Sequence, residues 1–182
     1  MITKDRITRL ASRQNLPAKT VERDYVLAHL VAAVASRSEG QKLVLKGGTA
    51  LRLCYFENYR YSADLDFTIL GGTLAEAFGI ISRGLKEYHR VDGLSLTEDA
   101  PPRIAYLGPL GRERTLKLDL TDDELVLNTE RRELLPRWAD LPGNLPVRVY
   151  TLLEVAGEKL RCVLQRLQCR DLLDLHQLFT EA

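Results

Sequence analysis

Apolar side chains recur at intervals of three and four residues near the start of the chain, a spacing typical of an amphipathic helix. Between residues 18 and 36 these positions are Val21, Tyr25, Ala28, Val31, Ala32 and Ala35. Pro17 stands just before this segment and Gly40 soon after it, and both residue types mark helix ends. The pattern therefore predicts one helix over residues 18–36.

The hydrophobic positions that follow have the pattern of strands and turns. Residues 43–45 are a short apolar run that ends at Gly47–Gly48, which predicts a buried strand leading into a tight turn. Thr49 can cap a short helix over residues 49–55, because its hydroxyl can accept a hydrogen bond from a free amide at the helix start. Residues 63–69 then alternate between acidic and apolar side chains, which is the period of a second strand.

The rest of the pattern predicts strands in the middle of the chain and helices at its end. The expected helices cover residues 73–87, 152–167 and 171–179, and the expected strands cover residues 91–96, 103–107, 113–120 and 147–150. Residues 128–146 contain three prolines and predict a long connection. In helix 152–167 one apolar stripe, with Lys159 at its margin, consists of Leu153, Ala156, Leu160, Val163, Leu164 and Leu167.

This order of elements predicts an α+β fold with a mixed β-sheet, flanking helices and a C-terminal helical part. The chain has 182 residues, of which 45% are apolar, enough to build a core for one domain over residues 1–182. Residues 1–150 would form the mixed-sheet core with its N-terminal helix, and residues 151–182 the C-terminal helices. No apolar stretch approaches the roughly 20 residues that a membrane-spanning helix needs, and no signal peptide is expected, so a cytoplasmic protein without a membrane partner is predicted.

Charge is divided unevenly along the chain, although the formal net charge is only +1. Residues 1–62 carry a balance of +6, and residues 63–182 carry one of −5. A net charge near zero excludes nucleic-acid binding by bulk electrostatics, so an RNA would have to bind a local basic patch. The candidates for such a patch are Arg52, Arg60, Arg166 and Arg170.

Acidic side chains on two predicted strands can form one site. Asp64 and Asp66 are two residues apart, so that both carboxylates point to the same face of a strand. Asp119 lies in an apolar strand, where an unpaired charge would be costly. If the two strands are neighbours, the three carboxylates suit two Mg²⁺ ions, one activating an attacking hydroxyl and one stabilising a pyrophosphate leaving group.

Other polar residues allow either a functional or a purely structural interpretation. The turn Lys46–Thr49 suits phosphate binding, although a glycine turn of this kind is a weak motif by itself. Ser62 can face the carboxylates or bond a loop amide, and Arg60 can clamp a phosphate or pair with an acid. Lys159 can contact a triphosphate or lay its aliphatic stem over the core.

Two aspartates near the end of the chain allow similar alternatives. Asp171 and Asp174 share one face of a predicted helix. A place in the first turn explains Asp171 without any function, because a negative charge there stabilises the helix. The spacing alone leaves the role of Asp174 open.

Several motifs stand in a fixed order along the chain. They are Val21–Tyr25, Leu45–Leu51, Arg60, Ser62, Asp64–Phe67, Lys117–Asp119, Thr151–Leu160 and Arg170–Leu175. Together these stretches resemble the AbiEii-type nucleotidyltransferase toxins, also called the MenT group, within the DNA polymerase β-like nucleotidyltransferase superfamily. The resemblance covers most of the chain.

The resemblance implies a nucleotidyltransferase fold and the transfer of a nucleotide from an NTP to an RNA acceptor such as a tRNA 3′ end, with Mg²⁺ as cofactor. It also implies the toxin of a toxin–antitoxin or phage-defence system, with a cognate antitoxin as partner. Catalysis would fall to Asp64, Asp66, Asp119 and Lys159, and metal binding to the three aspartates. Nucleotide binding would fall to Lys46, Gly47, Gly48, Thr49, Arg60, Ser62 and Asp171.

Two other functions fit the same residues. One is nucleotide transfer to a small molecule or a protein. The other is a catalytically silent module that binds a nucleotide or a partner. Three carboxylates placed together argue against the silent module, because they repel each other unless a cation lies between them.

Overall fold

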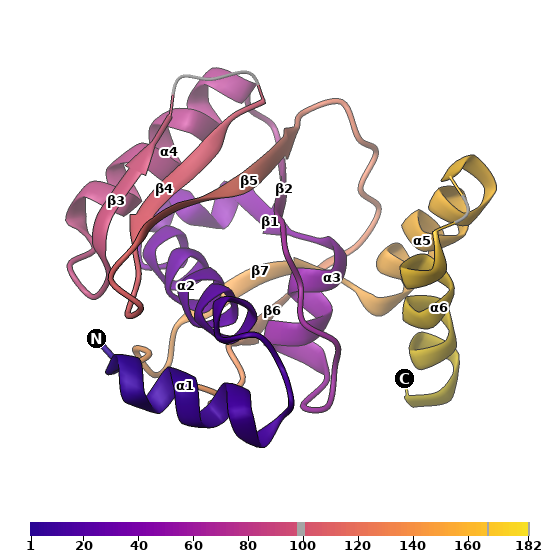
Figure 1. The fold of residues 1–182 in the computed structure, drawn as a ribbon. Coiled ribbons are helices and arrows are strands. Elements are labelled where there is room, and N and C mark those ends of the chain that lie inside the picture. Colours follow the sequence, from indigo (N-terminus) through magenta and orange to yellow (C-terminus); the bar gives the residue numbers. More distant parts are fainter. Residues whose placement is uncertain (98–100, 167, 182) are drawn as a thin grey trace.

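Seven strands of the described residues, which are 1–97, 101–166 and 168–181 of the computed structural model, form one mixed sheet. Their order across the sheet is β3-β4-β5-β2-β1-β7-β6 (Figure 1). The strands are β1 (Leu43–Leu45), β2 (Leu65–Ile69), β3 (Asp92–Leu96), β4 (Arg103–Leu107), β5 (Glu113–Thr121), β6 (Thr129–Glu133) and β7 (Pro146–Tyr150). The pairs β2–β5 and β1–β7 are parallel and the other pairs are antiparallel, so the sheet is mixed, as the sequence predicts.

Helices cover both faces of this sheet. They are α1 (Lys4–Arg13), α2 (Ala18–Ala35), α3 (Gly47–Ala50), α4 (Leu74–Glu87), α5 (Leu152–Arg166) and α6 (Cys169–Glu181). A short 3₁₀ segment, η1 (Ser38–Lys42), precedes β1, and a π-helical turn, η2 (Leu51–Tyr55), continues α3. None of the helices in the described ranges is both long enough and apolar enough to cross a membrane.

The alternation of side chains along the strands divides the core into two layers. Leu65 and Phe67 of β2 belong to the larger apolar cluster, which includes residues of α2 and α4. Val44 of β1 belongs to a smaller cluster on the opposite face, with Val155 of α5 and Leu178 of α6. Since neighbouring strand residues point to opposite faces, Asp66 of β2 lies on the same face as Val44, and Asp64 directly precedes the strand.

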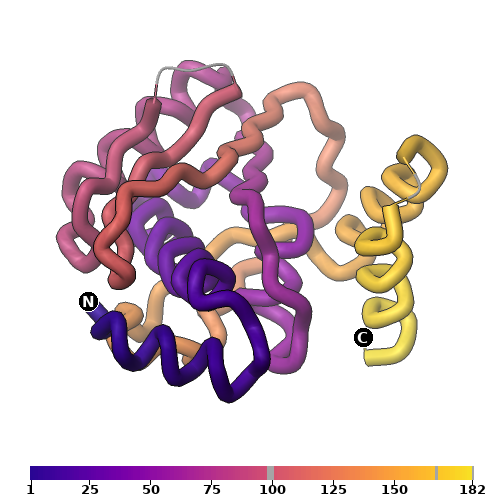
Figure 2. The backbone as a smooth tube through the Cα atoms, viewed as in Figure 1, coloured from indigo at the N-terminus to yellow at the C-terminus, as the bar shows by residue number. Residues whose placement is uncertain are grey.

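The two C-terminal helices lie together at one side of the molecule, reached by the chain directly after β7 (Figure 2). In that position α5 and α6 face the strand ends that carry the acidic motif. The fold therefore brings residues of α5 and α6 next to residues 46–48 and 60–66, which are far from them in the sequence (Figure 1).

The helices and strands that the sequence predicts from residue 18 onward are all present, with bounds that shift by two residues or fewer. Helix α1 is not predicted. It buries only Ile7 and Ala11, one turn apart, among charged residues, so its apolar pattern is too short to recognise.

The prediction of a long connection over residues 128–146 is wrong in part, because β6 (Thr129–Glu133) lies within it. This strand is at the edge of the sheet and pairs only with β7 in the described part of the chain. Its residues are Thr, Glu, Arg, Arg and Glu, a polar sequence without the alternation of a half-buried strand. Charged residues are common on edge strands because they prevent pairing with other chains.

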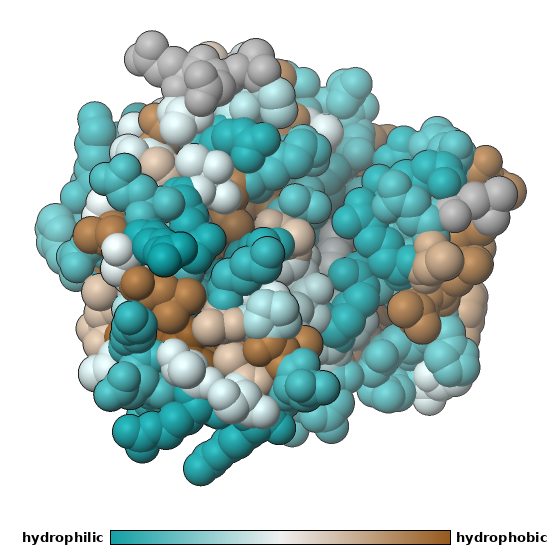
Figure 3. All heavy atoms as spheres, in the orientation of Figure 1, coloured by the Kyte–Doolittle hydropathy of each residue, from teal (hydrophilic) through white to brown (hydrophobic). Residues whose placement is uncertain are grey.

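The apolar stripe predicted for α5 has the opposite orientation to the one expected. Leu153 and Leu164 are 77% and 87% exposed, whereas Val155 and Lys159 are buried. Hydrophobic side chains accordingly cover part of the outer surface of the C-terminal helices (Figure 3). The inner face of α5 is mixed: Val155 packs in the smaller apolar cluster, and Glu158, Lys159 and Arg161 border a charged cavity.

Candidate active site

A cavity of about 490 Å³ lies between the acidic end of β2 and the C-terminal helices. Its lining comes from segments far apart in the sequence. These residues are Lys46, Gly47, Gly48, Arg60, Tyr61, Ser62, Ala63, Asp64, Asp66, Lys117, Asp119, Thr121, Glu158, Lys159, Arg161, Cys162, Gln165, Arg166 and Arg170. We call it the acidic-basic pocket, because aspartates line its sheet side while arginines and lysines line much of the remainder.

The glycine turn after β1 forms one wall of this pocket, and it needs both glycines. Gly47 has a φ of +66°, and a Cβ there would come within 2.8 Å of Asp66 Oδ2. A Cβ on Gly48 would lie 2.9 Å from Arg60 Nη2. The positive φ favours glycine at position 47, a Cβ at position 48 would displace Arg60, and the turn backbone lies directly against the charged groups.

The register of β2 and β5 places two carboxylates side by side. Asp66 pairs with Asp119 across these parallel strands, so the condition that the two strands be neighbours is met. Burial and then the nearby charges of Asp64, Asp119 and Glu158 raise the pKa of Asp66 to about 7. Negative charge is thus concentrated here, and a divalent cation would relieve it.

The three aspartates do not form a preformed metal cluster. Among the described residues, no three carboxylate, histidine or cysteine side chains are close enough together to hold a metal ion. The reason is local: Lys117 Nζ bonds to Asp119 Oδ2, and Asp64 Oδ2 is 3.9 Å from Arg170 Nη1. Oxygen donors of this kind fit Mg²⁺, provided that Asp119, which is 45% exposed, turns away from Lys117.

Lys46 is buried at the floor of the pocket by a network that the sequence does not reveal. Its ammonium bonds to Glu124, lies 3.1 Å from Thr121 Oγ1 and is 3.7 Å from Glu158 Oε1. Burial opposes ionisation of Glu124, but hydrogen bonds, chiefly from Lys46 and Thr68, lower its pKa to about 2. Lys46 is therefore held in place by carboxylates.

A second network joins the loop before β2 to the C-terminal helices. Asp174 is fully buried and accepts hydrogen bonds from Tyr59 Oη at 2.5 Å and from Arg60 Nε and Nη2 at 2.6 and 2.7 Å. Lys159 Nζ lies 2.9 Å from Asp174 Oδ2, which also accepts from Arg60 Nη2. These bonds, against the effect of burial, hold the pKa of Asp174 below its usual range. The sequence leaves the role of Asp174 open, and in the structure this residue positions Arg60 and Lys159 in the pocket wall.

Asp171 does not reach the pocket, in contrast to its predicted nucleotide contact. Its side chain is fully buried, 3.1 Å from Lys159 Nζ and within 3.1 Å of two Arg166 nitrogens. It can act on a ligand only through those two cations. Its place in the first turn of α6 also agrees with the structural interpretation.

Thr49 is likewise turned away from the pocket. Its hydroxyl is buried, 2.8 Å from Ser62 Oγ and 2.5 Å from the carbonyl oxygen of Asp64. This hydroxyl is thus engaged within the protein, and Thr49 is not among the residues that line the pocket. Instead, Thr49 fixes the segment that carries Ser62 and Asp64, both of which line the pocket.

Arg52 must be removed from the predicted basic patch. Its guanidinium is buried, bonded to Asp24 of α2 and to the carbonyl oxygen of Tyr59. Arg60, Arg166 and Arg170 do line the pocket. The sequence does not separate these cases, because the partner Asp24 is 28 residues away.

Sequence reasoning assigns no role to Lys117, Glu158 and Arg161, which all line the pocket. Lys117 and Glu158 lie within two of the quoted motifs, but nothing in the sequence singles out their side chains from surface charges. Glu158 and Arg161 are three residues apart on α5, on the face opposite the apolar stripe. The polar face of α5, opposite the apolar stripe, is the signal in the sequence that could have identified Glu158 and Arg161.

Comparisons with known proteins identify the family and the fold. A family model described as "Nucleotidyl transferase AbiEii toxin, Type IV TA system" matches residues 29–182. The fold is similar to the crystal structure of an antigenic nucleotidyltransferase-like protein from Paracoccidioides brasiliensis, with 16% sequence identity and a TM-score of 0.57. That match covers 86% of this chain and 76% of the other, and at such an identity it shows the fold alone. A search of curated proteins gives no match.

Proposed function

Because this chain belongs to the AbiEii family of nucleotidyl transferase toxins of type IV toxin–antitoxin systems, we propose that it transfers a nucleoside monophosphate from an NTP to a hydroxyl of RNA. The protein is a nucleotidyltransferase by its family, and such enzymes use an NTP and a divalent metal ion. The proposal adds Mg²⁺ as the ion and a tRNA 3′ end as the acceptor. A cognate antitoxin is the partner that the family suggests.

The observation that carries this proposal is the alignment of Asp66 with Asp119 beside the glycine turn, in a cavity that also holds cations. In this assignment, Asp64 and Asp66 hold Mg²⁺, and Asp119 completes the site on the acceptor side. A bound Mg²⁺ supplies activation of the attacking hydroxyl and neutralises the pyrophosphate that leaves.

The cations of the pocket are assigned to the triphosphate. Gly47 and Gly48 allow a phosphate to approach the turn backbone, since neither carries a side chain. Arg60 and Lys159 are oriented by Asp174 and provide fixed positive charge, which stabilises the charge that develops on the leaving phosphates. Lys46, Thr49, Ser62 and Asp171 are assigned positioning roles, because three of them are fully or almost fully buried in the bonds described above.

The acceptor is tested with α-labelled NTPs and total RNA. We expect label in RNA of tRNA size, and loss of that label when periodate has oxidised the terminal 2′,3′-diol. An Asp64→Asn variant, which removes a charge but little volume, is the matched control and should transfer no label. If the label migrates with small molecules or with the protein itself, the acceptor is not RNA, and this part of the proposal is wrong.

A further inference from the structure

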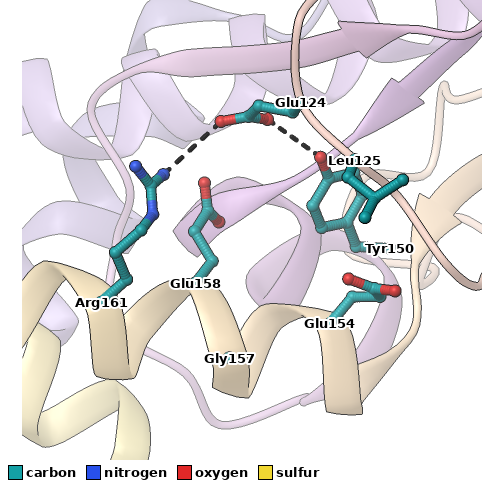
Figure 4. A pocket seen from close by; sticks show the side chains of 7 residues that line it. All are labelled: Glu124, Leu125, Tyr150, Glu154, Gly157, Glu158 and Arg161. Atoms are coloured by element: carbon teal, nitrogen blue, oxygen red, sulfur yellow. Dashed lines mark hydrogen bonds and ion pairs between the residues drawn. The ribbon is translucent and has the colours of Figure 1, made fainter.

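A second cavity, of about 340 Å³, adjoins the acidic-basic pocket (Figure 4). Its lining residues are Glu124, Leu125, Tyr150, Glu154, Gly157, Glu158 and Arg161. Glu158 and Arg161 line both cavities, so a ligand in the first can extend into the second. Glu154, Gly157 and Glu158 belong to the motif Thr151–Leu160, but the sequence alone assigns these three residues no ligand, and we call this space the side cavity.

The side cavity lies between two side chains and the backbone of a helix. Tyr150 and Leu125 lie on one side of it and the helix α5 on the other (Figure 4). A Cβ on Gly157 would meet no atom within 4 Å, so the helix backbone is open to the cavity at this point. A planar group can therefore lie against the helix at Gly157, with Leu125, which is 84% exposed, as the main apolar contact on the other side.

The polar groups of the side cavity offer mainly hydrogen-bond acceptors. Glu124 Oε2 is already occupied by Lys46, Thr68 and Tyr150. Glu154 Oε1 accepts from two backbone amides, and no hydrogen bond in the described part of the chain uses its Oε2. Glu158 Oε1 is 3.7 Å from Lys46 Nζ, and its Oε2 has no hydrogen bond within the described residues, so it can accept one from a ligand.

Charge determines which part of a nucleotide fits here. Three glutamates and one arginine line the side cavity, so a phosphate would meet net repulsion. A neutral ring that carries an amino group would instead donate to a glutamate, while a ring nitrogen or carbonyl accepts from Arg161.

Building on the proposed function, we propose that the side cavity is the base subsite for the NTP, and that it accepts bases with an exocyclic amino group and disfavours uracil. Adenine, cytosine and guanine each carry such an amino group next to an acceptor. On that edge uracil offers one N–H donor between two carbonyl acceptors, so the N–H can donate to a glutamate and one carbonyl can accept from Arg161. The other carbonyl would face a glutamate oxygen with no donor between them, which costs binding energy.

Gly157 allows the subsite to be tested separately from the phosphate site. We would measure binding of ATP, UTP and inorganic tripolyphosphate, each with Mg²⁺, to the wild type and to Gly157→Leu and Gly157→Ala. Leucine and alanine both favour a helix more than glycine does, so the fold of α5 is preserved. Leucine fills the cavity, whereas alanine leaves most of it open and serves as the control for a side chain at the same position.

We expect Gly157→Leu to weaken ATP binding by about tenfold or more, with tripolyphosphate unchanged and Gly157→Ala close to wild type. Unchanged ATP binding in Gly157→Leu, or equal losses for ATP and tripolyphosphate, would overturn the base subsite. A wild type that binds neither ATP nor tripolyphosphate would contradict the proposed function itself. The two failures are thus distinguishable.

A second variant tests the preference among bases. We expect UTP to bind the wild type about tenfold more weakly than ATP. Glu154→Gln keeps an acceptor for the two backbone amides and adds a donor that can bond a uracil carbonyl, so it should narrow that ratio to about threefold or less. Equal binding of ATP and UTP by the wild type, or a ratio unchanged in Glu154→Gln, would contradict this assignment.

Discussion

Asp66 combines burial with the negative charge of three neighbouring carboxylates, and both raise its pKa to about 7. In the unfolded chain the same carboxyl has a pKa near 3.8. Between these two values the folded protein binds the additional proton, so the metal-free protein loses stability as pH rises from about 4 to about 7. A bound cation would offset this loss of stability, because it would neutralise the repulsion among the carboxylates.

Replacing Asp66 by Asn should therefore stabilise the metal-free protein, and more so at high pH. With EDTA present, we expect the gain in free energy of unfolding to grow from pH 4 to pH 7 and then stay constant, at roughly 2 to 4 kcal/mol. Urea denaturation at pH 4.5 and pH 8 measures it. Asp123→Asn, the same change at an exposed position, should show no such trend. A gain that is equal at both pH values would place Asp66 outside the carboxylate group.

Asp174 shows how one buried carboxylate supports several functional groups. An Asp174→Asn variant keeps the shape of the side chain but leaves Arg60 and Lys159 without their shared counter-ion. We expect a loss of roughly 3 kcal/mol of stability, together with most of the transfer activity. Tyr59→Phe removes only one of the hydrogen bonds to Asp174 and should cost about 1 kcal/mol. Thermal unfolding and NTP turnover would be compared; similar behaviour of the two variants would argue against the positioning role of Asp174.

At the scale of elements, strand periodicity predicts the shared direction of two acids, and helix periodicity misplaces one face of α5. The alternation over residues 63–69 predicts Asp64 and Asp66 on the same side, and in the structure both line one pocket, Asp64 from just before β2 and Asp66 from within it. Their chemical role stays a prediction. In α5 both faces contain apolar residues, so the pattern does not reveal which of them is buried. The face that packs is chosen by the charges of Asp171 and Asp174, which bind Lys159.

The orientation of α5 predicts opposite results for two substitutions on the same helix. Val155 is fully buried, and Val155→Ala should cost about 1 to 2 kcal/mol of stability, because it leaves a small cavity. Leu164 is 87% exposed, so Leu164→Gln should change stability by no more than about 0.5 kcal/mol. Chemical denaturation of both variants measures this. A larger loss for Leu164→Gln would show that its surface is covered in solution.

At the scale of the whole molecule, long-range ion pairs are the part of the site that sequence cannot supply. Arg60 and Asp174 are separated by 114 residues, and Lys46 and Glu124 by 78. Their charges are visible in the sequence, but the pairing depends on the sheet order and on where α6 packs. The motif residues of the pocket are predictable because they cluster at strand ends, whereas their partners are not.

A buried histidine links three distant segments of the molecule and makes its stability depend on acid. His29 of α2 is fully buried, with Nδ1 2.6 Å from Tyr88 Oη and Nε2 3.5 Å from Asp140 Oδ1. Burial, only partly opposed by Asp140, lowers the pKa of His29 to about 4. Below pH 6.5 the unfolded state takes up a proton that the folded state does not, so stability falls as pH falls from 6.5 to 4.

We expect this histidine to remove about 3 kcal/mol of stability between pH 7 and pH 4. Urea denaturation across this range measures the loss. A His29→Gln variant should be less stable at pH 7 but should show a shallower decline toward pH 4. His176→Gln, at an exposed position of α6, is the control. If His29→Gln declines as steeply as the wild type, other groups cause the acid sensitivity.

The most direct test of the central claim follows the α and γ phosphates of the NTP separately. The protein is incubated with Mg²⁺, RNA and NTP labelled at either the α or the γ phosphate, alongside the Asp66→Asn variant. If Asp64, Asp66 and Asp119 direct nucleotidyl transfer, the α label enters RNA, the γ label is released as pyrophosphate, and Asp66→Asn gives neither product. Transfer of the γ label to an acceptor, or full activity in Asp66→Asn, would contradict the account.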